Sequence, residues 1–232
     1  MRINKSFSLQ HIALFIVLLF HVSGAIGILF TSYKDWFIQN TPLNLLIMAV
    51  LLIITQPQKN LAFLLFFAIA FATGFVVEWI GVNTGYLFGN YQYGNVLGTK
   101  YSGIPFLIGI NWFIIIYCTG VISQKLQNWS NKQLEAMQAA VKPSVQLISF
   151  ITDGAMLATF FDFVMEPVAV KLGFWQWAGS GDIPFYNYAC WLIISLLLLV
   201  VFRLLPFEKN NQLAVHLFII QLLFFLSLRI FL

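Results

Sequence analysis

Charged residues are scarce in this chain of 232 residues. Lys and Arg number 12 and Asp and Glu number 8, so charged residues make up 9% of the sequence while hydrophobic residues make up 60%. A soluble domain has roughly 25% charged residues and roughly 45–50% apolar ones. The shortage of charge excludes a soluble globular enzyme, and the high apolar content excludes a disordered chain. The class that remains is an integral membrane protein with little mass outside the bilayer.

Several chemical motifs are also absent from the sequence. It has no glycine-rich phosphate loop, no nucleophile–His–Asp order, no aspartate-rich diphosphate motif and no basic run typical of nucleic-acid binding. No mid-helix lysine suits a retinal Schiff base, and no His or Cys pair has metal-ligand spacing. We therefore expect no metal, no cofactor and no nucleic acid partner. The two cysteines, Cys118 and Cys190, fall in apolar stretches and are predicted to be buried without a disulfide.

The apolar runs predict an all-α fold, a polytopic membrane helix bundle with about seven transmembrane helices in a single domain of residues 1–232. The predicted helices are 10–31, 42–55, 61–80, 104–123, 144–166, 188–206 and 212–231. The first run exceeds the roughly 7–15 apolar residues of a signal peptide, so we expect a retained helix. The polar residues 124–143 are predicted to form a short interfacial helix or a linker.

The distribution of Lys and Arg predicts the orientation of the bundle. One side carries the N-terminus and the connections after the second, fourth and sixth helices, with eight basic residues: Arg2, Lys5, Lys59, Lys125, Lys132, Lys142, Arg203 and Lys209. The other side carries four: Lys34, Lys100, Lys171 and Arg229. Basic residues favour the cytoplasmic side, so we predict the N-terminus inside and the C-terminus outside, in the plasma (inner) membrane.

Four of the acidic residues lie in or at the ends of the predicted helices: Glu78, Asp153, Asp162 and Glu166. A carboxylate in the hydrocarbon costs at least about 2.5 kcal/mol, so each is a candidate functional residue. Asp162 and Glu166 are four residues apart and share a helix face. Asp153 points to the opposite face, where a second site and a helix-packing role are both open.

The order of the helices brings many polar and aromatic residues to one end of the bundle. From the helices come Glu78, Asn111, Trp112, Asp162, Glu166 and Trp191, and from the loops 81–103 and 167–187 come Asn83, Tyr91, Tyr93, Trp175, Trp177 and Asn187. One interpretation is an aromatic belt with interfacial carboxylates. The other is a cap, formed by the glycine- and tyrosine-rich loop 81–103, that folds back over a cavity.

Carboxylic acids in an apolar pocket can act as general acids at neutral pH, because burial keeps them protonated. Such an acid can protonate an isolated carbon–carbon double bond and give a tertiary carbocation, which nearby aromatic rings stabilise. Water can then add, or a second alkene can close a ring. The substrate would be a long apolar polyene of the bilayer.

Two blocks of sequence resemble the integral membrane proteins of carotenoid biosynthesis, a family that includes the bisanhydrobacterioruberin-type carotenoid hydratases. The first block comprises Glu78–Gly85, Gly89–Tyr93, Leu97-Gly98, Ile104-Pro105 and Asn111-Trp112. The second comprises Asp162–Pro167, Trp175-x-Trp177, Ile183-Pro184, Tyr186-Asn187 and Trp191. The resemblance covers about residues 74–192, and the first and last helices match only in hydrophobicity.

The resemblance implies an enzyme that hydrates the terminal double bond of an acyclic carotenoid, with water as the second reactant. Our hypothesis is that Asp162 or Glu166 donates the proton and that Glu78, with Asn83 or Asn111, positions the water. An association with other carotenoid enzymes is a further expectation. Two alternatives stay open: a lycopene-type cyclase with the same protonation step, and a membrane carrier or proton-coupled transporter that uses the three carboxyl groups as a relay.

Overall fold

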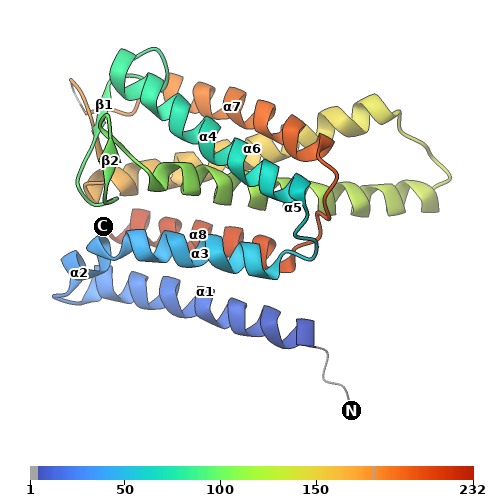
Figure 1. The fold of residues 1–232 in the computed structure, drawn as a ribbon, viewed down its shortest axis with the longest axis horizontal. Helices are drawn as coiled ribbons and strands as arrows, with labels where there is room; N and C mark the ends of the chain where they lie inside the picture. The colour runs from blue at the N-terminus through green and yellow to red at the C-terminus, as the bar shows by residue number, and fades with distance from the viewer. Residues whose placement is uncertain (1–4, 180) are drawn as a thin grey trace.

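The computed structural model describes residues 5–179 and 181–232, which form a bundle of roughly aligned helices (Figure 1). The helices are α1 (Lys5–Phe30), α2 (Lys34–Gln39), α3 (Thr41–Thr55), α4 (Leu61–Thr84), α5 (Leu107–Ala136), α6 (Pro143–Lys171), α7 (Phe185–Leu204) and α8 (Gln212–Phe231). Six of them are long and apolar enough to cross a membrane, namely α1, α4, α5, α6, α7 and α8. The predicted polytopic helical membrane fold is confirmed.

The shorter apolar helix α3 also runs along the bundle axis, so the chain passes along the bundle seven times (Figure 1). The beginning of α1 and the end of α8 therefore lie at opposite ends of the bundle. The side that faces the cytoplasm stays a prediction from the basic residues. One of those residues, Arg2, lies outside the described residues.

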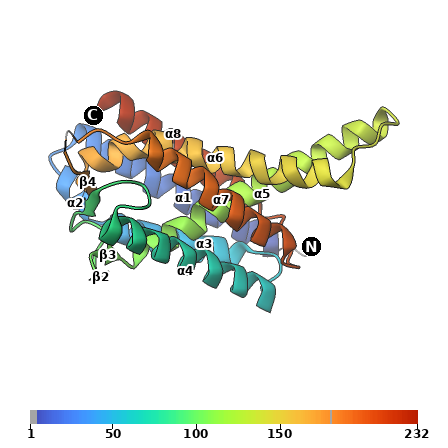
Figure 2. The ribbon, with the colours of Figure 1, turned by 90° about the horizontal axis from the view of Figure 1, so that it is seen from above.

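Helices α4, α5 and α6 continue beyond the ends that the apolar pattern predicts. Helix α6, predicted to end at residue 166, continues through Pro167 to Lys171. Helix α4 continues to Thr84 and ends at Gly85, whose φ of 69° is the left-handed conformation that glycine adopts easily. Helix α5 continues through residues 124–136, which therefore extend that helix and form no separate interfacial element. These residues are polar but are mostly good helix formers, and no proline or glycine interrupts them. The hairpin of α5 and α6 consequently projects beyond the bundle (Figure 2).

Four short strands lie at one end of the bundle, where α4 ends and α5 begins (Figure 1). Strand β1 (Tyr91–Tyr93) pairs antiparallel with β4 (Trp175–Trp177), and β2 (Lys100–Tyr101) pairs antiparallel with β3 (Ile104–Pro105). The β1–β4 pair joins the connection between α4 and α5 to the connection between α6 and α7. We call this pair the cap.

The core of the bundle is rich in aromatic side chains, and both cysteines are buried and free, as predicted. Close packing of α4 on α5 depends on Gly74, because a Cβ atom there would lie 2.5 Å from Cβ and Cγ of Trp112. That distance is shorter than van der Waals contact allows. Trp112 is fully buried, so it has no free space into which it can move.

We expect Gly74→Ala to destabilise the protein by about 1–3 kcal/mol, the usual cost of an overpacked core. The added methyl group must displace the indole of Trp112 from its position between α4 and the rest of the bundle. Ala72→Val serves as the control, since it adds methyl groups to the same helix at an exposed position. The measurement is the thermal unfolding midpoint in detergent. Equal midpoints for both variants and the wild type would show that the contact is not tight.

Candidate functional site

Three carboxyl groups, those of Glu78, Asp162 and Glu166, line one small cavity beneath the cap. The cavity volume is about 20 Å³, which is enough for about one water molecule. Ten of the twelve residues predicted for the site line it: Glu78, Tyr91, Tyr93, Asn111, Asp162, Glu166, Trp175, Trp177, Asn187 and Trp191. The predicted convergence at one end of the bundle is therefore present. We call this space the acid cavity.

The buried carboxyl group of Glu78 on α4 accepts three hydrogen bonds. Its Oε2 accepts from the hydroxyl of Tyr91 and from that of Tyr93, the latter at 2.7 Å, and its Oε1 accepts from Nε1 of Trp112 at 3.0 Å. Burial, and then the neighbouring Glu78, raise the pKa of both phenols well above the usual value for tyrosine. The phenols therefore stay protonated at neutral pH and remain donors to Glu78.

The buried carboxyl group of Glu166 on α6 accepts hydrogen bonds from two indole groups. Nε1 of Trp175 and Nε1 of Trp177 both donate to Oε1, at 2.6 Å and 2.7 Å. An indole N–H group can only donate a hydrogen bond, and a carboxyl oxygen is a suitable acceptor for it. These two hydrogen bonds thereby fix Glu166 in the last part of α6, which ends at Lys171.

The cap explains how these four donors reach two different carboxyl groups. In the antiparallel register Tyr91 lies opposite Trp177 and Tyr93 lies opposite Trp175. Alternate side chains of a strand point to opposite faces, so these four side chains face inward while Gln92 and Gln176 are exposed. The phenols of β1 bond Glu78 and the indoles of β4 bond Glu166. The cap thus holds both glutamates, which agrees with the second interpretation of the loop 81–103.

Asp162 on α6 has a different environment from the two glutamates. Its side chain is fully buried, and Oδ2 accepts one hydrogen bond, from Nδ2 of Asn187 at 2.9 Å. Its Oδ1 is buried with no hydrogen-bond partner in the described part of the chain. A buried carboxylate oxygen without a donor is costly, whereas a protonated oxygen there is an available acid. The arrangement of donors therefore singles out Asp162 among the three acids.

Aromatic rings form much of the wall of the acid cavity. Trp191 on α7 lines it, and Trp112 stacks against Trp191 with ring centroids 3.9 Å apart and an interplanar angle of 10°. Trp112 does not line the cavity itself. It contacts two residues that do, by stacking on Trp191 and by donating a hydrogen bond to Glu78. Phe88, Ile108 and Met165 also line the cavity. These three were not predicted, because an apolar residue in an apolar chain carries no sequence signal.

The structure places two polar candidates outside the acid cavity. Asn83 is exposed at the end of α4, and its Nδ2 donates to the backbone oxygen of Trp79 at 2.9 Å and to that of Ser102 at 3.4 Å. Asp153 is half-buried and accepts from Ser149 Oγ at 3.1 Å. Asn111 lines the cavity. Of the two asparagines considered for positioning water, only Asn111 lies at the cavity.

Within residues 5–179 and 181–232, no three His, Cys, Asp or Glu side chains form a group that could hold a metal ion. The acid cavity instead combines three carboxyl groups with hydrogen-bond donors and aromatic rings. The chemistry that such a set can perform is proton transfer to and from a substrate in a nearly dry, aromatic environment.

Comparison with known proteins identifies a family whose sequence pattern this chain matches. A sequence model of the family described as "Carotenoid biosynthesis protein" matches residues 40–232. The chain is also similar to the bisanhydrobacterioruberin hydratase of Haloarcula japonica, with 27% identity over 129 residues. That match covers 54% of this chain and 40% of the hydratase, so it spans less than half of the relative's length. No solved structure matches the chain.

Proposed function

This chain belongs to the carotenoid biosynthesis protein family, and from that membership we propose that it hydrates the terminal carbon–carbon double bond of an acyclic carotenoid. The similar protein from Haloarcula japonica is named as a hydratase, which supports this reaction class. The observation that carries the proposal is the unpartnered Oδ1 of Asp162 at a cavity of one-water size. An acid, a place for water and a wall of aromatic rings meet there.

The first step is protonation of the alkene by Asp162. The π electrons of the double bond take the proton from the carboxyl group, a new C–H bond forms, and Asp162 becomes a carboxylate. The positive charge remains on the other, tertiary carbon. The rings of Trp191, Trp175 and Trp177 line the cavity and stabilise the cation by cation–π attraction.

The second step is capture of the cation by water. A lone pair of the water oxygen forms the C–O bond, and the resulting oxonium returns one proton to the carboxylate of Asp162. The sum is one alkene plus one water giving one tertiary alcohol, with no redox change. Asn111 and Glu78 are the groups that would orient the water, since both line the cavity. The proposed location is the plasma membrane, with the N-terminus inside.

The proposal is tested by expressing the chain in a host that accumulates lycopene and measuring the mass of the pigments. Hydration predicts a gain of one water for each end that reacts. An unchanged mass with altered chromatographic retention would instead indicate cyclisation. Unaltered pigment in cells that contain the folded protein would contradict an enzymatic role on this substrate and favour a carrier.

A further inference from the structure

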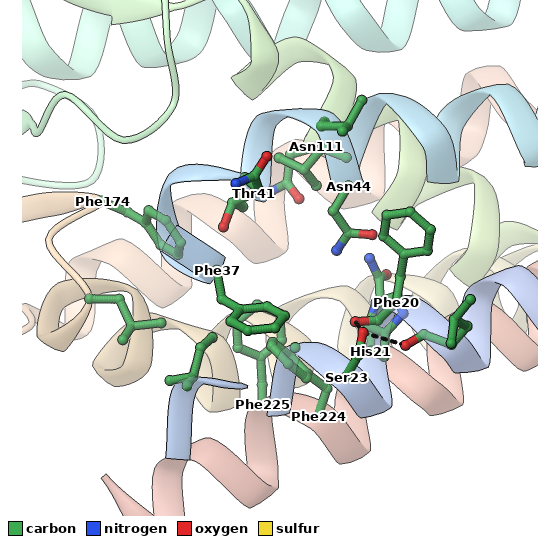
Figure 3. Close-up of a pocket in the computed structure, with 18 of the residues that line it drawn as sticks. Phe20, His21, Ser23, Phe37, Thr41, Asn44, Asn111, Phe174, Phe224 and Phe225 are labelled. Carbon is green, nitrogen blue, oxygen red and sulfur yellow. Dashed lines mark hydrogen bonds between the residues drawn. The ribbon is translucent and has the colours of Figure 1, made fainter. Parts of the chain in front are cut away.

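The bundle contains a second and much larger cavity, with a volume of about 540 Å³ (Figure 3). Its walls come mainly from α1, α2, α3 and α8, with Asn111 of α5 and Phe161 of α6. We call it the groove. This volume lies within the roughly 300–1,000 Å³ typical of sites for small molecules. The acid cavity has room for about one water only, so the body of any substrate must lie elsewhere.

The groove offers a nearly apolar surface to a ligand. Its aromatic lining includes Phe20, Phe37, Phe224 and Phe225, which surround the space in Figure 3. Several of its polar side chains bond the backbone of their own helix. His21 Nδ1 lies 2.8 Å from the oxygen of Val17, Ser23 Oγ donates to that of Leu19 at 2.6 Å, and Asn40 Nδ2 donates to that of Trp36 at 2.8 Å. These three groups have partners already, whereas Oδ1 of Asn44 in the same lining is buried with no hydrogen-bond partner in the described part of the chain. The rest of the lining is mainly apolar and suits a hydrocarbon.

The groove and the acid cavity share a wall at three places. Asn111 lines both spaces. On α6, Phe161 lines the groove and its neighbour Asp162 lines the acid cavity. Before and within β4, Phe174 lines the groove and Trp175 lines the acid cavity, with ring centroids 6.3 Å apart. The two spaces therefore adjoin at Asn111, Phe161 and Phe174, close to the acid.

The groove is also accessible from the lipid side of the bundle. Trp36, Leu43 and Leu19 line it and are 60%, 52% and 50% exposed. These residues lie on α2, α3 and α1, the helices at one side of the bundle (Figure 1). A hydrophobic molecule dissolved in the bilayer could enter here without crossing water.

We propose that the groove binds the hydrocarbon chain of an acyclic polyene, so that the terminal double bond passes Asn111 and reaches Asp162. This inference rests on the proposed function, because the hydratase reaction defines which end must meet the acid. The occupant is a linear isoprenoid and not a phospholipid. A mainly aromatic and aliphatic site that adjoins one amide and one acid at Asn111 and Asp162 fits a molecule whose reactive group is a terminal alkene.

The test fills the groove by Gly24→Leu on α1. A Cβ atom at Gly24 would lie 3.4 Å from Phe224 Cε2 and 3.9 Å from Cζ, so a side chain can start there and extend into the groove. Val22→Leu is the control, because Val22 is 53% exposed on the same helix and does not line the groove. A second filling variant is Leu45→Phe, which enlarges the lining from α3.

The readout is the amount of lycopene that stays with the purified protein from a lycopene-accumulating host, measured by absorbance per protein. It is measured in an Asp162→Asn background, so that bound substrate is not converted. We expect Asp162→Asn and Asp162→Asn/Val22→Leu to retain lycopene. We expect Gly24→Leu or Leu45→Phe in this background to retain at least about tenfold less lycopene, because the added side chain occupies part of the binding surface. A tenfold change corresponds to about 1.4 kcal/mol of binding free energy.

The outcomes separate this inference from the proposed reaction. Full retention of lycopene by both folded groove variants would overturn the inference while leaving the reaction intact. Co-purified phospholipid in place of lycopene would overturn it as well. A third outcome is that the wild type converts no pigment while Gly24→Leu still removes bound lycopene. That result would support lycopene binding in the groove and contradict the hydratase function. Thermal unfolding and size-exclusion profiles show which variants are folded.

Discussion

Asp162→Asn should lower the rate of carotenoid hydration by about 10²–10⁴-fold, the usual contribution of a general acid. Asparagine has nearly the same shape as aspartate, and its side-chain oxygen can still accept the hydrogen bond that Asn187 donates to Oδ2. The variant should therefore fold and bind substrate, but it has no acidic proton to give. The measurement is the rate of product formation by purified protein.

Asp153→Asn is the matched control for this prediction. Asp153 lies on the same helix, is half-buried and does not line the acid cavity. Its replacement should leave the rate within about twofold of the wild type, as expected for a side chain away from the reaction. A fully active Asp162→Asn would remove the acid assignment. Loss of activity in Glu166→Gln with a fully active Asp162→Asn would transfer the role to Glu166.

Glu78→Leu should destabilise the protein by at least about 3 kcal/mol. It removes the acceptor for Tyr91, Tyr93 and Trp112, and each donor left buried without a partner costs about 1–3 kcal/mol. Burial, the largest cause of the raised pKa of the two phenols, does not depend on Glu78, so the phenols cannot relieve the loss by ionising at neutral pH. The cap should loosen as a result, and the thermal midpoint in detergent should fall.

A set of matched variants separates this cause from a general effect of the substitution. Glu135→Leu changes an exposed glutamate on the projecting part of α5 and should leave the midpoint unchanged. Adding Tyr91→Phe and Tyr93→Phe to Glu78→Leu removes two of the orphaned donors and should restore part of the lost stability. No recovery in the triple variant would show that the donors are not the cause.

The sequence predicted the helical bundle because apolar runs of this length have few other solutions in a membrane. It also predicted that Glu78, Asp162 and Glu166 would meet, since the order of the helices places their ends on one side. The ends of α4, α5 and α6 were missed. Polar residues at the ends of α4 and α5 look like a loop in a hydropathy pattern, and the predicted end of α6 at residue 166 precedes Pro167, through which the helix continues to Lys171. Only the backbone caps, such as Gly85, show where the helix stops.

The pairing of the cap strands and the position of the groove could not be predicted from the sequence, for different reasons. The period-two spacing of Tyr91 and Tyr93, and of Trp175 and Trp177, is a strand signal, but three residues are too few to identify a partner more than eighty residues away. The groove depends on α1 and α8, whose residues show only hydrophobicity in sequence. Its position beside the acids follows from packing alone.

The central claim is that a carboxylic acid protonates the terminal alkene and that water captures the cation. The most direct measurement is the reaction of purified protein with lycopene in D₂O, followed by return of the product to H₂O and mass spectrometry. Hydration predicts the mass of the alcohol with one carbon-bound deuterium for each end that reacts, because the O–D deuterium exchanges and the C–D deuterium does not. An alcohol without carbon-bound deuterium, or lycopene recovered unchanged, would contradict the account.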